Sequence, residues 1–307
     1  MNLSLCMIVK NEEKNLPRCL RSAQRLVDEV VIVDTGSTDS TREVAISFGA
    51  RLVEHTWQES FCDARNVSIT NAKGNWILTI DADEEFEEAS ISKILSATNN
   101  KDVDGYALPR CKSSEGPRPF FRTLKTSLFR NMPEIRFSGI VHEDVFFSIA
   151  ESRRRFLDAW IIDHNFNNPI QAKDLYYLGL CQRRLQLDAT DNMAAYFAGL
   201  HSWRIGKGVQ AITLFQQAVS ETRRPIYSIL SALVLTQIAM IGNAEEAPPQ
   251  LNKAQTLLYK YERNFDVQMH PELQEAIEKL RPLVAGAAKL RSDHRNLRIR
   301  KIFEVFF

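Results

Sequence analysis

The spacing of apolar residues changes several times along the first part of the chain. Short apolar runs rich in β-branched residues, typical of buried strands, occur at residues 3–9, 29–34, 51–55 and 76–81. Between these runs apolar residues recur at helical spacing, at residues 15–24, 38–48 and 61–72. Strands that alternate with helices predict a parallel sheet covered on both faces, with any ligand at the carboxyl ends of the strands.

The segment at residues 105–164 has a different pattern of apolar residues. Strand-like pieces without intervening helical patterns occur at residues 105–112, 125–131, 135–145 and 155–164, with turns at Ser113–Pro119 and Met132–Pro133. We interpret this segment as an antiparallel extension of the same domain.

After residues 165–169 the pattern becomes almost wholly helical. Helices are predicted at residues 173–187, 192–205, 209–222, 226–240, 249–263 and 271–290. Gly199, Ala211, Phe215 and Ala218 have the offsets of a tetratricopeptide-type hairpin, although a plain helical bundle fits the same residues. We therefore predict an α/β domain at residues 1–168, an α-helical domain at residues 169–290 and a tail at residues 291–307.

The tail is basic and ends in apolar residues. Residues 289–307 carry six basic and two acidic side chains and close on "RIRKIFEVFF". Such a segment, Arg298–Phe307, could dock on an anionic membrane face or could pack back on the helices.

Composition limits the classes of function. The chain has 307 residues with 39 basic and 38 acidic side chains, a net charge of +1, which argues against a nucleic-acid partner. Its five cysteines are scattered and fit reduced thiols, and no signal peptide or membrane-spanning run is evident. We expect a cytoplasmic protein, with peripheral contact at the inner membrane face as an added hypothesis.

Six carboxylates crowd into residues 81–88, directly after an apolar strand. Asp81 and Asp83 are spaced so that one could reach a divalent metal such as Mg²⁺ or Mn²⁺ directly, and the other through water or a ribose hydroxyl. The metal would also bind diphosphate oxygens. Glu84, Glu85, Glu87 and Glu88 are interpreted as a solvated first helical turn.

Other polar residues are expected at the same edge of the sheet. Asn11, Glu12, Asp34, Arg65 and Asn66 all follow predicted strands or face their ends. An acidic residue at the end of the second strand is well placed to bind a ribose or a base edge, while Ser37, Thr38 or Asp39 caps the next helix. Neither glycine-rich phosphate-binding motif, G-x-G-x-x-G or G-x-x-x-x-G-K-[ST], occurs.

Four segments together resemble the family 2 glycosyltransferases, which have the GT-A fold. They are "CMIVKNEEKNLPRCLRSA", "VDEVVIVDTGSTDSTREVAISFGA", "FCDARNVSITNAKGNWILTIDADEEF" and "IRFSGIVHEDV". The resemblance covers residues 1 to about 165, and is closest to a bacterial subgroup of lipopolysaccharide core glucosyltransferases and tetratricopeptide-containing peptide S-glycosyltransferases.

The resemblance implies a nucleotide-sugar donor, with UDP favoured as the nucleotide. Asp34 would contact the nucleobase or ribose, with Asn11 and Glu12 beside it, and Arg65 would lie near the base or the diphosphate. Asp81 and Asp83 would be the family's D-x-D motif, and would hold the metal and the ribose.

The resemblance also assigns the chemistry to residues 141–143, the subgroup's V-H-E element. Glu143 would be the catalytic base, with Asp144 as the alternative and His142 beside them. His164 resembles a late histidine of the subgroup that completes the metal or diphosphate site, although a capping or packing role is equally open.

The leading hypothesis is an inverting, metal-dependent hexosyltransferase with a saccharide acceptor, such as lipopolysaccharide core or another surface glycan. A peptide or protein acceptor, glycosylated on oxygen or sulfur, is the alternative within the enzyme class. Outside that class stand a non-catalytic helical scaffold and a nucleotidyltransferase. The latter predicts a glycine-rich basic loop after the first strand, where this chain has "KNEEKN".

Overall fold

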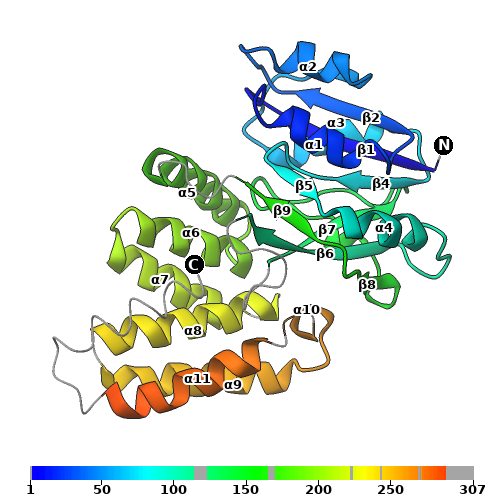
Figure 1. Cartoon of the computed structure of the whole chain (residues 1–307). Coiled ribbons are helices and arrows are strands. Elements are labelled where there is room, and N and C mark those ends of the chain that lie inside the picture. Colours follow the sequence, from blue (N-terminus) through cyan, green and yellow to red (C-terminus); the bar gives the residue numbers. More distant parts are fainter. Residues whose placement is uncertain are drawn as a thin grey trace. The chain divides into compact units, whose positions relative to one another are not determined.

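The computed structural model describes residues 2–113, 123–164, 170–221, 224–242, 244–268, 270 and 272–287 (Figure 1). Most of the predicted turn at Ser113–Pro119 and the whole predicted tail at residues 291–307 lie outside these ranges. The chain divides into two compact units, Met1–Asn168 and Pro169–Phe307.

One half of the sheet in the first unit is parallel. Its strands, in the spatial order β3-β2-β1-β4, are β1 (Leu3–Val9), β2 (Glu29–Asp34), β3 (Arg51–Glu54) and β4 (Trp76–Thr79). The connections contain α1 (Leu16–Ala23), α2 (Thr41–Ser47) and α3 (Phe61–Thr70). The β-strand and helix pattern predicted from residue spacing is confirmed in this half.

The other half of the sheet is mixed. Its strands are β5 (Glu84–Phe86), β6 (Gly105–Lys112), β7 (Thr123–Arg130), β8 (Arg154–Phe156) and β9 (Ile161–Asp163). β7 is antiparallel to β4 and β6, and β5 is antiparallel to β9. However, β8 and β9 both run parallel to β6, so the predicted antiparallel extension is only partly right. The predicted fold class, an α/β domain followed by a helical region, is confirmed.

Two local predictions were wrong. The strand expected at residues 135–145 is a loop with one isolated bridge, Ser138↔Asp144, because Gly139 and His142 have φ of 98° and 51°, which no pleated strand accommodates. The helical turn expected after Asp83 is instead the strand β5, since Glu84–Phe86 pairs with β9. The short helix α4 (Ile91–Ala97) follows it, after the 3₁₀ turn Glu88–Ser90.

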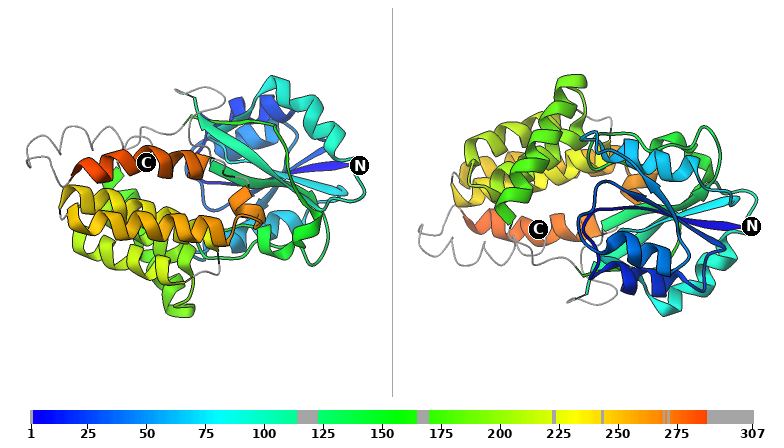
Figure 2. Two further views of the ribbon diagram at one scale, coloured as in Figure 1. Left: turned by 90° about the horizontal axis from the view of Figure 1, so that it is seen from below. Right: turned by 90° about the horizontal axis from the view of Figure 1, so that it is seen from above.

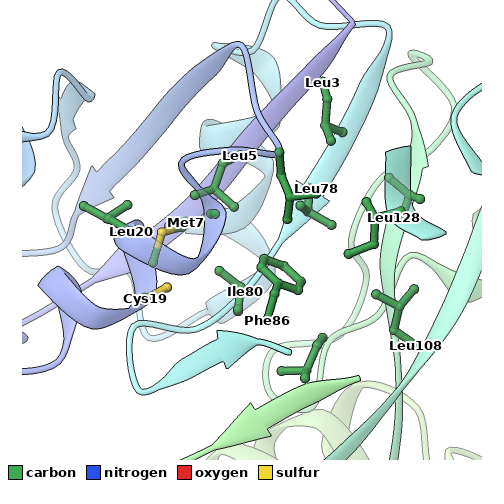
Figure 3. Close-up of a cluster of buried hydrophobic side chains, with 14 of the residues drawn as sticks. Leu3, Leu5, Met7, Cys19, Leu20, Leu78, Ile80, Phe86, Leu108 and Leu128 are labelled. Atoms are coloured by element: carbon green, nitrogen blue, oxygen red, sulfur yellow. The ribbon is translucent and has the colours of Figure 1, made fainter. Parts of the chain in front are cut away.

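Two apolar cores pack on opposite faces of the sheet, and Figure 2 shows helices on both sides of it. Leu3, Leu5 and Met7 alternate along β1 toward the face covered by α1, where they meet Cys19 and Leu20 (Figure 3). The intervening side chain of Cys6 belongs to the other core. This period-two alternation fixes the register of the strands, and so fixes which residues emerge at their carboxyl ends.

The second unit is helical. Its helices are α5 (Ile170–Leu187), α6 (Asn192–Arg204), α7 (Gly208–Ser220), α8 (Pro225–Ile241), α9 (Ala247–Lys260), α10 (Phe265–Gln268) and α11 (Glu272–Ala287). The six predicted helices agree with these bounds to within three residues, and α10 was not predicted. Among the described helices, none combines the length and the apolar character that crossing a membrane requires.

Helices α6 and α7 approach each other closely at Gly199. A Cβ atom added there would lie 2.7 Å from the ring of Phe215, which is fully buried together with Ala211 and Ala218. The small and aromatic residues that suggested a tetratricopeptide hairpin therefore mark a tight helix pair. A tetratricopeptide array remains a proposal.

We predict that Gly199→Ala destabilises the helical unit by roughly 1–3 kcal/mol, because the new methyl group overpacks the Phe215 ring. Gly179→Ala on α5 is the matched control, since none of the described residues that could clash with its added Cβ lies within 4 Å of it. The control should be neutral or up to about 1 kcal/mol more stable, from helix propensity alone. Urea unfolding followed by circular dichroism measures both, and equal midpoints for the two variants would contradict the prediction.

Candidate active site

The loops that follow β1 and β2 are tied together by Asn11. Its side-chain Oδ1 accepts the backbone N–H of Thr38 at 2.8 Å, and its own N–H donates to Ser37 Oγ at 2.9 Å. Asn11 has φ of 57°, a left-handed conformation that asparagine tolerates better than most residues. The N–H of Glu12 donates to Thr41 Oγ1 at 2.7 Å. The two loops therefore form one surface at the strand ends.

A hollow of about 250 Å³ lies on this surface. It is lined by Asn11, Glu12, Glu13, Lys14, Asn15 and Asp39. Within it Glu12 Oε2 accepts a hydrogen bond from Asn15 Nδ2 at 2.9 Å. The predicted donor-binding residues Asn11 and Glu12 therefore border a concave, polar surface.

Asp34 is held inside the turn that it begins, and its side chain is fully buried. Its carboxylate accepts the N–H of Ser37 at 3.1 Å and Arg42 Nε at 2.8 Å, while Gly36 makes the turn with φ of 102°. Burial alone would raise the pKa of Asp34, but the bonds from Ser37 and Arg42 outweigh it and lower that pKa. Asp39 Oδ1 accepts the Thr41 N–H at 3.0 Å, at the start of α2. The N-cap of α2 is Ser40, which makes no side-chain capping bond, so the cap predicted at Ser37, Thr38 or Asp39 was wrong, although Asp39 supports the first turn. The nucleotide role of Asp34 stays a prediction.

Arg65 joins Asp81 to Glu143. From α3, its Nη2 lies 2.7 Å from Asp81 Oδ1, and its Nε donates to Glu143 Oε1. The Arg65 side chain is only 8% exposed, and its guanidinium lies against the ring of Phe137. Its remaining nitrogen, Nη1, is buried and has no hydrogen-bond partner among the described residues. The structure thus brings three predicted site residues together, with one donor of Arg65 still to be satisfied.

The second oxygen of Asp81 contacts Lys125. Lys125 Nζ lies 2.8 Å from Asp81 Oδ2 and 3.1 Å from Glu84 Oε2. Arg110 then contacts Glu84 Oε1 at 2.9 Å and Asp163 Oδ2 at 3.5 Å. Carboxylates and cations therefore alternate in an ion-pair chain, whose members are Glu143, Arg65, Asp81, Lys125, Glu84, Arg110 and Asp163.

Electrostatics keep Asp81 and Lys125 charged. Burial alone would raise the pKa of Asp81, but Lys125 and Arg65 more than offset that effect and hold the pKa far below its usual range. Burial would likewise lower the pKa of Lys125, but the carboxylates of Asp81 and Glu84 outweigh it and raise that pKa. Asp81 and Lys125 are therefore both ionised near neutral pH.

Three members of the ion-pair chain were missed from the sequence, and one was misread. Lys125, Arg110 and Asp163 lie on strands β7, β6 and β9, where they looked like ordinary strand polarity. Glu84 was expected to be solvated, but it is fully buried between Arg110 and Lys125. Strand pairing is the information that locates Lys125. Because β7 runs antiparallel to β4, the first residues of β7 lie beyond the end of β4, next to the acidic turn.

Asp83 and His164 lie opposite each other in the backbone. The N–H of His164 donates to the carbonyl oxygen of Asp83 at 3.0 Å, because β5 and β9 pair with Glu84 opposite Asp163. His164 Nε2 lies 2.9 Å from Glu85 Oε1, so Glu85 is not merely solvated either.

The three candidate metal ligands offer the ligand types that a divalent ion accepts, namely two carboxylates and an imidazole. Both oxygens of Asp81 contact cations of the chain, and His164 Nε2 contacts Glu85. Within the described residues, the ligand atoms of Asp81, Asp83 and His164 do not all lie within 4.8 Å of one another. The three side chains are therefore not preassembled as one metal site in this arrangement, and their metal role stays a prediction.

The two adjacent carboxylates after His142 have different surroundings. Glu143 is directed to Arg65, with a side chain that is 9% exposed. Asp144 Oδ1 accepts the N–H of Phe146 at 2.8 Å, at the start of the 3₁₀ turn Phe146–Ser148. The geometry therefore links Glu143 to Asp81, and gives Asp144 a structural contact.

Comparison with known proteins gives a consistent result. The model of the family described as Glycosyl transferase family 2 matches residues 4–160. An uncharacterized glycosyltransferase of Rickettsia bellii is 36% identical over 202 residues, 58% of this chain and 68% of that protein. A TPR repeat-containing protein of Synechococcus elongatus is 40% identical over 141 residues, 46% of this chain, but this chain spans only 34% of its length.

Among solved structures, Staphylococcus aureus TarS 1-349 in complex with UDP-GlcNAc is 15% identical, with a TM-score of 0.48. That likeness covers 86% of this chain and 92% of the TarS chain. Such a low score and identity say nothing about the site or the substrate of this chain.

We predict that Arg65→Met destabilises the first unit by about 3–5 kcal/mol, because it leaves the buried Glu143 carboxylate without its cation. Lys93→Met is the matched control, since Lys93 forms a half-exposed pair with Asp158 whose loss should cost less than about 1 kcal/mol. Chemical unfolding of the two variants compares the costs. A similar loss in both would show that the ion-pair chain adds no stability beyond that of a surface pair.

Proposed function

The chain belongs to glycosyl transferase family 2, and on that premise we propose that it transfers a hexose from a nucleoside-diphosphate sugar, UDP-sugar first, to an acceptor with inversion at the anomeric carbon. The observation that carries this proposal is the bridge that Arg65 makes between Asp81 and Glu143. One guanidinium joins the D-x-D turn to the candidate base, so the donor edge and the base belong to a single charged cluster.

Glu143 is proposed as the general base. In a single displacement its carboxylate takes the proton of the acceptor hydroxyl or thiol, whose oxygen or sulfur then bonds to the anomeric carbon. The bond from that carbon to the diphosphate breaks, and the diphosphate leaves with the electron pair. Arg65 orients Glu143 by donating its Nε–H to Oε1 of the carboxylate. Asp144 is less suited, because it supports the Phe146 N–H.

The donor is proposed to lie across the strand ends. Asn11 and Glu12 would border it, Asp34 would bind the ribose or base, and Nη1 of Arg65 would donate to a phosphate oxygen. Asp83 and His164, with Asp81 beside them, would hold Mg²⁺ or Mn²⁺, which when bound neutralises charge on the leaving diphosphate.

For the acceptor we propose a saccharide, such as lipopolysaccharide core or another surface glycan, reached from the cytoplasm. A peptide or protein held by the helical unit is the second candidate, and the tight α6 and α7 pair supports a tetratricopeptide-like binding role for it. A non-catalytic scaffold is disfavoured, because such a protein would not need Asp81, Asp83 and Glu143, and this chain has all three.

The proposed function predicts nucleotide release from one sugar nucleotide in a panel that includes UDP-glucose and UDP-N-acetylglucosamine. Release should require Mn²⁺ or Mg²⁺, stop on addition of EDTA, and fall at least about 100-fold in Asp83→Ala. Glu88→Ala is the control, since Glu88 is an exposed partner of Arg25, and it should retain activity. Full turnover in EDTA would exclude the metal-dependent mechanism.

The assignment of the base predicts that Glu143→Gln lowers kcat by roughly 10²–10⁴-fold, because glutamine is nearly the same shape but cannot accept a proton. Its affinity for UDP, measured by calorimetry, should change little. The neighbouring variant Asp144→Asn should keep kcat within a few-fold of the wild type. If Asp144→Asn loses activity while Glu143→Gln keeps it, the base is Asp144.

A further inference from the structure

We propose that Lys125 is a further donor-binding residue, which leaves Asp81 when the nucleotide sugar binds and contacts the phosphate nearest the sugar. This inference rests on the proposed function and adds a residue to it. Neither the D-x-D turn nor the V-H-E element contains Lys125, which lies on β7, between the two motifs in the sequence.

The strand register brings Lys125 to the donor edge. β7 is antiparallel to β4, with Leu128 opposite Leu78, so Lys125 lies three residues beyond that pair, past the last residue of β4, Thr79. At about 3.3 Å per residue this is roughly 10 Å along the strand. Asp81 lies three residues after Leu78, and Lys125 lies three residues before Leu128. Because the strands are antiparallel, both residues lie on the same side of the Leu78 and Leu128 pair, which brings Lys125 to Asp81.

Lys125 can leave Asp81 without leaving a buried carboxylate unpaired. Glu84 would keep Arg110 at 2.9 Å and would still accept the N–H of Asp81 at 2.9 Å. Asp81 would keep Arg65, at 2.7 Å. The side chain of Lys125 is 20% exposed, so its ammonium group has room to move toward solvent. Lysine has a flexible stem and a compact charge, which suit such a swing.

Arg65 is not free to make the same move. Its side chain is only 8% exposed, lies against Phe137, and is the cation that contacts Glu143. Its buried Nη1 nevertheless has no partner among the described residues, and so lacks an acceptor. A buried N–H group without an acceptor is costly, and a phosphate oxygen would satisfy it. Arg65 therefore stays in place and donates, while Lys125 moves.

Charge balance favours the exchange. The ion-pair chain contains four carboxylates, on Glu143, Asp81, Glu84 and Asp163, and three cations. A divalent ion beside Asp83 would repel the nearby ammonium of Lys125, and a diphosphate would attract it. The two cations that hold Asp81 before binding, Arg65 and Lys125, would then face the diphosphate from adjacent positions.

The test compares UDP with UMP as ligands, with Mn²⁺ present and without acceptor, by isothermal titration calorimetry on the full chain. The phosphate nearest the sugar is present in UDP and absent from UMP. Lys125→Met should bind UDP about 10- to 100-fold more weakly than the wild type, as expected for a lost charge-assisted hydrogen bond, while its affinity for UMP stays within about threefold. Lys125→Arg should restore most of the affinity for UDP.

Two further variants complete the test. Lys93→Met, a half-exposed lysine on α4, should leave both affinities unchanged. Lys125→Gln keeps an N–H donor for Asp81 and Glu84 but loses the charge, so it gives the same comparison if Lys125→Met does not fold.

The outcomes separate this inference from the proposed function. If the wild type binds UDP and both uncharged variants bind it equally well, Lys125 has no role in donor binding and the proposed function stands. If UDP and UMP weaken by the same factor, the role of Lys125 is structural and the inference fails. If neither UDP nor the diphosphate of any other base binds the wild type, the proposed function itself fails.

Discussion

The structure of the first unit depends on pairing four carboxylates at one edge of its sheet. Three of them are largely shielded from water, on Glu143, Glu84 and Asp163, and the fourth, on Asp81, is partly exposed. A buried carboxylate that lacks a cation costs several kcal/mol of folding free energy. The three cations that pair with them come from α3, β6 and β7. The mixed half of the sheet thus supplies two of the three cations, and one of them, Lys125, contacts Asp81 of the D-x-D turn.

The sequence predicted the elements better than it predicted their contacts. The parallel strands and the six long helices follow from local periodicity, which depends on residues a few positions apart. The contacts of Lys125 and Arg110 with Glu84 depend instead on which strands pair and in what register, over separations of 41 and 26 residues. A short segment such as Glu84–Phe86 joins a sheet only because β9 is there to pair with it, so its acidic composition suggested a solvated turn.

The proximity of candidate site residues was predictable where they stand in short motifs. Asp81 and Glu143 were selected from the sequence, and the structure places both against Arg65, while their roles stay predictions. Residues 135–145 show the opposite case, because alternating apolar residues suggested a strand there. The positive φ of Gly139 and His142 breaks that strand into a loop, and the loop is what lets Glu143 reach Arg65. Backbone conformations of this kind are not encoded in hydrophobic pattern, and a histidine in them carries no sequence signal.

The same ion pairs that stabilise the edge also determine how a ligand must enter it. A structural metal site is a cage whose ligands are unpaired until the ion binds, and such a site folds with its metal. Here both oxygens of Asp81 contact cations that belong to the chain, so the fold does not need a divalent ion to neutralise that carboxylate. On the proposed mechanism a metal and a diphosphate would arrive together and replace internal partners with external ones. The free energy of donor binding is then the difference between the internal ion pairs that are lost and the contacts with the metal and the diphosphate that are gained. Among the contacts of Asp81, the one with Lys125 is more accessible to solvent than the one with Arg65.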